Sequence, residues 1–149
     1  MDRDELLAVG QQALAAQSFS RLLGTQLRSF APGEAVLEIP LRADLLQQNG
    51  FVHGGVLSYA ADNALTFAGG SMLGPNVLTS EYKINYLHPA QGVRLIARGS
   101  VVHSSRRQAV CRCDVLVVKG NGEERLCATA QGTIVAVSAE NGAGQEPGR

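Results

Sequence analysis

The sequence predicts an α+β fold in which a curved antiparallel sheet wraps around one long helix. First, residues 54–70 are apolar or small almost all round, a pattern typical of a buried helix. Second, strand-like runs follow one another across short turns, as they do in an antiparallel sheet. Third, 149 residues suit one compact domain. A helix that is apolar on every side must be covered by the sheet and by something else, so we also expect self-association.

The segment before the central helix is predicted to contain a helical region and two strands. Apolar residues recur from Asp4 to Leu23 at helical spacing, which predicts an amphipathic helix with a break near Ser18. Strands are then expected over residues 25–30 and 35–41, joined by a turn at Pro32 and Gly33.

Four more strands are expected after the central helix. They cover residues 77–87, 93–103, 108–119 and 125–137. The Asn121-Gly122 pair between the last two is a strong hairpin signal. We therefore divide the chain into an N-terminal helical segment (1–23), a single α+β domain (24–137) and a polar, glycine-rich tail (138–149) that we expect to be flexible.

Composition excludes several classes of function. The 13 basic and 13 acidic residues balance, which argues against a nucleic-acid-binding protein. No apolar run approaches the ~20 residues of a membrane span, and no basic, then apolar N-terminal segment suggests a signal peptide. The three cysteines lack zinc-ligand spacing, so we expect buried reduced thiols and no metal site. The expectation is a cytoplasmic protein that binds neither nucleic acid nor membrane.

One carboxylate stands out against this apolar background. Asp62 is the only charged residue between Leu45 and Ser80, and it lies in the middle of the helix expected to be most buried. An unpaired carboxylate in a dry core is costly, and Asp is a poor helix former. Ser58, Asp62 and Thr66 share one helical face. Asp62 is therefore either a satisfied acid bonded to a neighbouring strand or a functional group.

A His-Gly-Gly motif comes directly before the same helix. Gly54 and Gly55 allow close approach of a ligand to the backbone, and the first amides of a helix have no internal partner. The positive end of the helix dipole could hold a developing oxyanion there. Asp62 lies eight residues further on, about 12 Å along the axis at ~1.5 Å per residue. A carboxylate acting beside Gly54 is thus expected from a symmetric partner helix.

These motifs together resemble the hotdog-fold acyl-CoA thioesterases, in particular the PaaI-type and 4-hydroxybenzoyl-CoA thioesterase groups. The resemblance is carried by His53-Gly54-Gly55, by Asp62 nine positions after His53, and by the stretch 78–90. It covers about residues 24–137 and implies the hotdog fold. It also implies hydrolysis of an acyl-CoA to free acid and CoA without a cofactor, in a homo-oligomer (dimer or tetramer) with its active site at the subunit interface.

The resemblance implies a role for each matching residue. Asp62 corresponds to the nucleophile or general base, the Gly54 amide polarises the thioester carbonyl, and His53 supports the loop and the thioester. Gln47 corresponds to a polar side chain near the carbonyl. Either of two hydroxyls, Thr66 or Thr79, corresponds to the group that orients water. Residues expected near the substrate are Gly55, Asn49 and Ser58.

The expected handle of the substrate is anionic. Arg106 and Arg107 stand at a turn, and the resemblance makes them candidates for contacts to the CoA phosphates, for which the planar guanidinium is well suited. A solvated basic turn is the alternative. Two other functions also remain open: a hotdog dehydratase that acts on enoyl or hydroxyacyl thioesters with His53 as base, and a non-catalytic acyl-CoA-binding protein.

Overall fold

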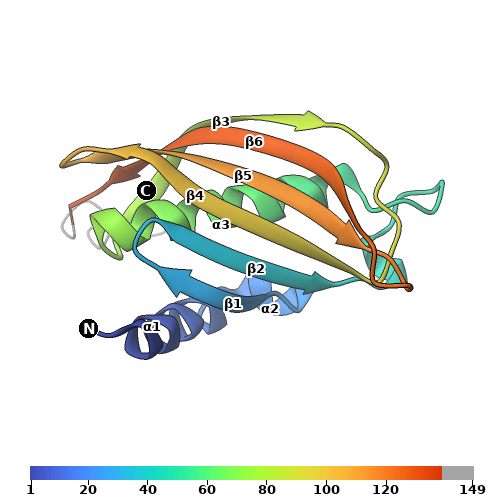
Figure 1. The fold of residues 1–149 in the computed structure, drawn as a ribbon, viewed down its shortest axis with the longest axis horizontal. Coiled ribbons are helices and arrows are strands. Elements are labelled where there is room, and N and C mark those ends of the chain that lie inside the picture. The colour runs from blue at the N-terminus through green and yellow to red at the C-terminus, as the bar shows by residue number, and fades with distance from the viewer. Residues whose placement is uncertain (139–149) are drawn as a thin grey trace, which may run out of the picture.

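The computed structural model describes residues 1–138, so the expected tail lies outside the described residues except for Ser138. Six antiparallel strands form one curved sheet in the order β1-β2-β4-β5-β6-β3, with the helix α3 lying along it (Figure 1). The elements are α1 (Arg3–Ala15), α2 (Ser18–Leu23), β1 (Gln26–Ala31), β2 (Glu34–Pro40), a short 3-10 turn (Ala43–Leu45), α3 (Gly54–Leu73), β3 (Val77–Tyr86), β4 (Arg94–Ser104), β5 (Gln108–Val118) and β6 (Glu124–Ala136). The predicted fold class is confirmed.

The N-terminal segment forms two helices with the break where the sequence predicts it. Asp2 and Glu5 form a capping box at the start of α1, and each side chain accepts a hydrogen bond from the other residue's amide. The helix α1 packs closely on β1, because a Cβ added at Gly10 would lie only 2.6 Å from Leu27. Gly24 ends α2 with a φ of 74°, a left-handed conformation that favours glycine.

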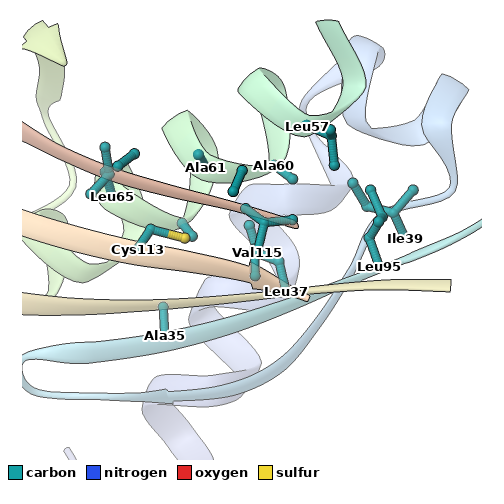
Figure 2. Packing of buried hydrophobic residues seen from close by; sticks show 14 of the residues in the cluster. Ala35, Leu37, Ile39, Leu57, Ala60, Ala61, Leu65, Leu95, Cys113 and Val115 are labelled. Atoms are coloured by element: carbon teal, nitrogen blue, oxygen red, sulfur yellow. The ribbon is translucent and has the colours of Figure 1, made fainter. Parts of the chain in front are cut away.

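Small side chains let α3 lie close to the sheet. Ala60, Ala61 and Ala64 are fully buried against leucine and valine side chains of the strands, as Figure 2 shows for the first two. Gly99 of β4 has no side chain at the closest approach, where an added Cβ would lie 2.5 Å from the Ala64 carbonyl oxygen. The small residues of the helix therefore serve packing along one side of it.

The two edges of the sheet differ in what covers them. Beside β1 lies α1, and the Gln11 side chain donates a hydrogen bond to the Leu27 carbonyl oxygen at 3.2 Å. Strand β3 has β6 on one side and no strand on the other within residues 1–138. Leu78 and Leu87 on and after β3 are 60 % and 45 % exposed. An uncovered strand edge with exposed leucines is a surface suited to pairing with another strand.

The three cysteines are buried free thiols, as expected. Cys111 and Cys113 lie on the inner face of β5, and Cys127 lies on β6. Burial raises the pKa of Cys111 to about 11. Burial and the neighbouring Asp114 carboxylate raise the pKa of Cys113 to about 12. Within residues 1–138 there is no helix with the length and apolar character needed to cross a bilayer.

Candidate active site

His53 is the cap of α3, and it explains the glycine that follows it. Its ring Nδ1 accepts a hydrogen bond from the Gly55 amide at 2.8 Å. A Cβ at Gly55 would lie 2.9 Å from that same Nδ1, so a larger residue would displace the cap. Because Nδ1 is an acceptor here, the proton of the neutral ring is on Nε2. Among the described residues no acceptor pairs with the Gly54 amide, which remains available to a ligand.

The loop before α3 is held by its own hydrogen bonds. The Gln47 amide donates to the Phe51 carbonyl oxygen at 2.8 Å, and the His53 amide donates to the Leu45 carbonyl oxygen at 2.9 Å. The side-chain oxygen of Gln47 accepts from the Asn49 amide, so it faces its own loop. Gln47 and Asn49 are thus fixed near the start of α3, although no contact joins either side chain to Gly54.

Asp62 is placed against β3 by a hydroxyl. Thr79 donates a hydrogen bond from Oγ1 to Asp62 Oδ1 at 2.7 Å. Thr66 Oγ1 donates to the backbone oxygen of Asp62 at 2.8 Å and lies 3.1 Å from Thr79 Oγ1. Both candidate hydroxyls therefore meet at Asp62, but only Thr79 contacts the carboxylate. Across residues 1–138, no cation pairs with Asp62 and nothing bonds its Oδ2.

Within a single chain, the sheet leaves one face of α3 partly uncovered, which is the situation for which the sequence predicts self-association. The face that carries Ser58, Asp62 and Thr66 is only half-buried. The sheet covers the opposite, alanine-rich side, and the polar face looks toward β3 at the edge of the sheet. The uniform apolar pattern hid this difference, because Ala and Gly suit both packed and partly open surfaces.

Two tyrosines of β3 line the same face and were missed by the sequence analysis. The Tyr82 hydroxyl hydrogen-bonds the Ser58 hydroxyl, one helical turn before Asp62. The Tyr86 hydroxyl donates to the Gly54 carbonyl oxygen at 3.2 Å. Tyr82 and Tyr86 are four residues apart on one strand, so they share a face. Two tyrosines four residues apart, on the strand expected directly after the central helix, are the sequence signal that could have identified them.

The basic turn lies far from Gly54 in the same chain. Arg106 and Arg107 are exposed in the turn between β4 and β5, and the Arg107 carbonyl oxygen accepts from the Ala136 amide beside the start of β3. In Figure 1 this turn lies at the end of the molecule where α3 finishes, opposite the loop that precedes α3. The structure therefore does not bring these arginines to the His53 loop within one protomer.

A second group of basic residues does lie at the His53 end. An open depression of about 670 Å³ runs from Phe51 to the loops after β3 and β5, and its basic lining residues are His88, Lys119 and Arg125. Arg125 lies 3.2 Å from His88 Nδ1, so the ring accepts from the guanidinium. Within residues 1–138, no acidic residue lines this depression. These residues are scattered along the sequence, so no local motif identifies them.

Comparisons with known proteins identify the family and the fold. Residues 49–124 match the thioesterase superfamily. A similar protein from Halobacterium salinarum is named as an esterase. It is 31% identical to this chain over 122 residues, which cover 77% of this chain and 80% of that protein. A thioesterase family protein from Silicibacter pomeroyi has a similar structure, with a TM-score of 0.81 and 34% identity over 85% of this chain and 93% of its own.

The phenylacetic acid degradation protein PaaI of Thermus thermophilus is also similar. A point mutant of that protein superimposes with a TM-score of 0.72 and 34% identity over 81% of this chain and all of its own. The matched range covers all of α3, including Asp62, and strands β3, β4 and β5. On the evidence of its sequence and of its hotdog fold, the chain belongs to the thioesterase superfamily.

Proposed function

We propose that this protein hydrolyses an acyl-CoA thioester to a free acid and CoA, with Asp62 as the reacting carboxylate. The observation that carries the proposal is the setting of Asp62. It is the single charge on α3, Thr79 holds one of its oxygens, and the other oxygen has no partner within residues 1–138. A carboxylate so oriented, with one oxygen open, is arranged to attack a carbonyl or to take a proton from water.

The chemistry needs few groups, because a thiolate leaves easily at neutral pH. In one route, Asp62 Oδ2 attacks the thioester carbonyl, the C–S bond breaks to release CoA thiolate, and water then hydrolyses the mixed anhydride. In the other, Oδ2 takes a proton from water, the resulting hydroxide attacks the thioester carbonyl, and the C–S bond breaks to release the acid and CoA thiolate. Either way a negative charge develops on the carbonyl oxygen, and the Gly54 amide at the helix N-terminus is the donor that would stabilise it. His53 Nε2–H and Gln47 lie at the same helix end.

The proposed site is shared between two protomers. Gly54 and Asp62 are about 12 Å apart along α3, so one thioester cannot meet both on one chain. Antiparallel pairing of two β3 edges would place a second α3 alongside the first in the opposite direction. A two-fold axis near Ser58, midway between the two residues, would bring Gly54 beside the partner's Asp62. A dimer is the smallest active unit, and pairs of dimers would give a tetramer.

The same symmetry gives the basic turn a role. An antiparallel partner would carry its own turn, with Arg106 and Arg107, past the Gly54 end of the first chain. We infer that the CoA phosphates, at the far end of the extended pantetheine arm, meet that turn or the depression around Lys119 and Arg125. Asn49, Gly55 and Ser58 are the proposed contacts closer to the thioester.

Loss of Arg106 and Arg107 should raise KM for acyl-CoA and leave KM for the matching acyl-pantetheine unchanged.

Thiol release from a panel of aromatic, short-chain and medium-chain acyl-CoAs tests the proposal. We expect release on at least one class, with little activity left in Asp62→Asn. Hydration of an enoyl-CoA without thiol release would instead indicate a dehydratase, and tight binding without turnover a non-catalytic acyl-CoA-binding protein. The dehydratase needs a free base in His53, whereas its Nδ1 is occupied as the cap of α3.

A further inference from the structure

Strand β3 contains one extra residue at the point where it passes Asp62. Thr79 pairs with Ile134 of β6, and the next pair is Glu81 with Thr133. Ser80 therefore has no partner residue across the strand pair, which makes it a β-bulge. The pairing then continues in regular register to Tyr86.

The bulge decides which way the side chains of β3 face. Thr79 and Tyr82 are three residues apart, so a regular strand would place them on opposite faces of the sheet. Both instead face α3, where Thr79 bonds the Asp62 carboxylate and Tyr82 bonds Ser58. Ser80 and Glu81 between them are exposed. Without the extra residue, either Thr79 or the tyrosines would point away from the helix.

Two residues hold the bulge in place. Glu81 Oε2 accepts a hydrogen bond from the Thr133 amide of β6 at 3.1 Å, so this side chain joins the bulge to the neighbouring strand. Gly132 pairs with Tyr82, two residues after the bulge, and an added Cβ there would lie 2.5 Å from the Glu81 carbonyl oxygen and 2.5 Å from Tyr82 Cβ. Glycine inside a strand is unfavourable, and here it allows the close approach of β3.

We propose that Glu81 and Gly132 are positioning residues for thioester hydrolysis: they fix the bulge at Ser80 and so keep the Thr79 hydroxyl on the Asp62 carboxylate. The inference rests on the proposed function, but neither residue is proposed to touch the substrate. Glu81 is exposed, and Gly132 has no side chain. Both act through Thr79 rather than on the reacting atoms.

A double-mutant cycle between Glu81 and Thr79 tests the proposal by activity. Glu81→Ala should lower kcat about tenfold with little change in KM, the loss expected for one hydrogen bond to a charged group. Glu81→Gln should recover most of that activity, because the amide oxygen can still accept from Thr133. In a Thr79→Ala background, Glu81→Ala should have no further effect. Lys83→Ala, an exposed change on the same strand, is the control and should behave as wild type.

The glycine is tested by a matched pair. Gly132→Ala should lower kcat as Glu81→Ala does, because the added methyl displaces the bulge. Gln131→Ala, an exposed change at the neighbouring position of β6, should leave kcat unchanged. Because Gly132→Ala also strains β6, the surface change at Glu81 is the decisive variant.

An NMR measurement tests whether Glu81 and Gly132 fix the Thr79 side chain, and it does not depend on catalytic activity. Three-bond couplings to the Thr79 methyl carbon report its χ1 rotamer, and hydrogen exchange reports the Thr133 amide. We expect Glu81→Ala and Gly132→Ala to lose the single Thr79 rotamer, and Glu81→Ala to speed exchange at Thr133. An unchanged Thr79 rotamer, or equal effects of Glu81→Ala with and without Thr79, would overturn the proposal. If wild type hydrolysed no thioester, the proposed function would fail while the rotamer result still stood.

Discussion

Asp62 is where the residue-scale evidence concentrates. Its identification from sequence relied on scarcity, since no other charge occurs over residues 46–80. The hydroxyl that serves it could not be identified that way. Thr66 is related to Asp62 by helical spacing, whereas Thr79 reaches it from β3, where a bulge lets Thr79 and Tyr82 face α3 together. Contacts within one helix follow from periodicity, but contacts across an irregular strand depend on register.

The two threonines should differ in their effect on activity. We expect Thr79→Ala to lower kcat about 10–100-fold, because it removes a hydrogen bond to a charged oxygen. Thr66→Ala should cost only a few-fold, since its hydroxyl bonds the Asp62 backbone. Thr79→Ser, which keeps the hydroxyl, serves as the control. Steady-state thioester hydrolysis measures all three, and a larger loss for Thr66→Ala would reverse the assignment of roles.

The buried thiols predict a pH dependence of stability. Folding raises the pKa of Cys111 to about 11 and of Cys113 to about 12, so both thiols keep their protons longer in the folded state. Their contribution to stability is complete below the unfolded pKa of about 9 and is lost as pH rises through the folded values. Tm should therefore fall between pH 9 and 12.

Cys113→Val provides the comparison for that measurement, because other groups also titrate at high pH. The variant should lose less Tm over the same pH range than wild type. Iodoacetamide at pH 8 should label the folded protein slowly and the unfolded protein quickly. Equal pH dependence in both proteins, or equal labelling rates, would contradict the burial of these thiols.

At the scale of elements, the start of α3 combines a cap and an available amide. His53 caps the helix through Nδ1, and Gly54 is its first residue. The sequence predicts this helix start well, because a glycine pair after a polar residue is a local signal. The contact of Tyr86 with Gly54 could not be predicted in this way, because Tyr86 lies at the end of β3, far from Gly54 in the sequence.

Removing the Gly54 amide tests its proposed role directly. Proline is tolerated at the first helical position, so Gly54→Pro removes the N–H with little damage to the helix. We expect kcat to fall about 10²–10³-fold, the usual effect of losing one oxyanion donor. Gly54→Ala keeps the amide, and its Cβ would meet Tyr86 at an ordinary 3.6 Å. Equal kcat values for the two variants would exclude this amide as the oxyanion donor.

Most elements could be predicted to within a few residues. The turn at Asn121-Gly122 and the alternation along β4 and β5 are local properties, and the structure places these strands where the sequence does. The bulge at Ser80 could not be predicted, because nothing in its own residues marks it. Its signs are the glycine across the strand pair, Gly132, and the reach of Glu81 to Thr133.

At the scale of the whole molecule, the proposed site needs a second chain. The bare edge of β3 and the half-buried face of α3 lie on the same side of the protomer. The sequence indicated self-association through the apolar helix. It could not show that the basic turn and the His53 loop lie at opposite ends of one chain, because that depends on the direction of every strand.

Mixed oligomers test whether the site is shared. Asp62→Asn and Gly54→Pro should each be nearly inactive alone. In a mixed dimer, one site would combine both intact residues and the other would combine both defects. Random mixing makes half of the dimers mixed, so about one quarter of wild-type activity should return. Co-expression with two affinity tags isolates the mixed species, and a failure to regain activity would place both residues in one chain's site.

The most direct test of the whole account compares wild type with Asp62→Asn on the best acyl-CoA of the panel. Asparagine keeps the size of the side chain and can still accept from Thr79, so the fold should be preserved. We predict that kcat/KM falls by about 10²–10⁴-fold, the range typical of a lost acid–base or nucleophilic group, while Tm stays close to that of wild type. Equal thiol release by the two proteins would contradict the assignment of Asp62 as the reacting carboxylate.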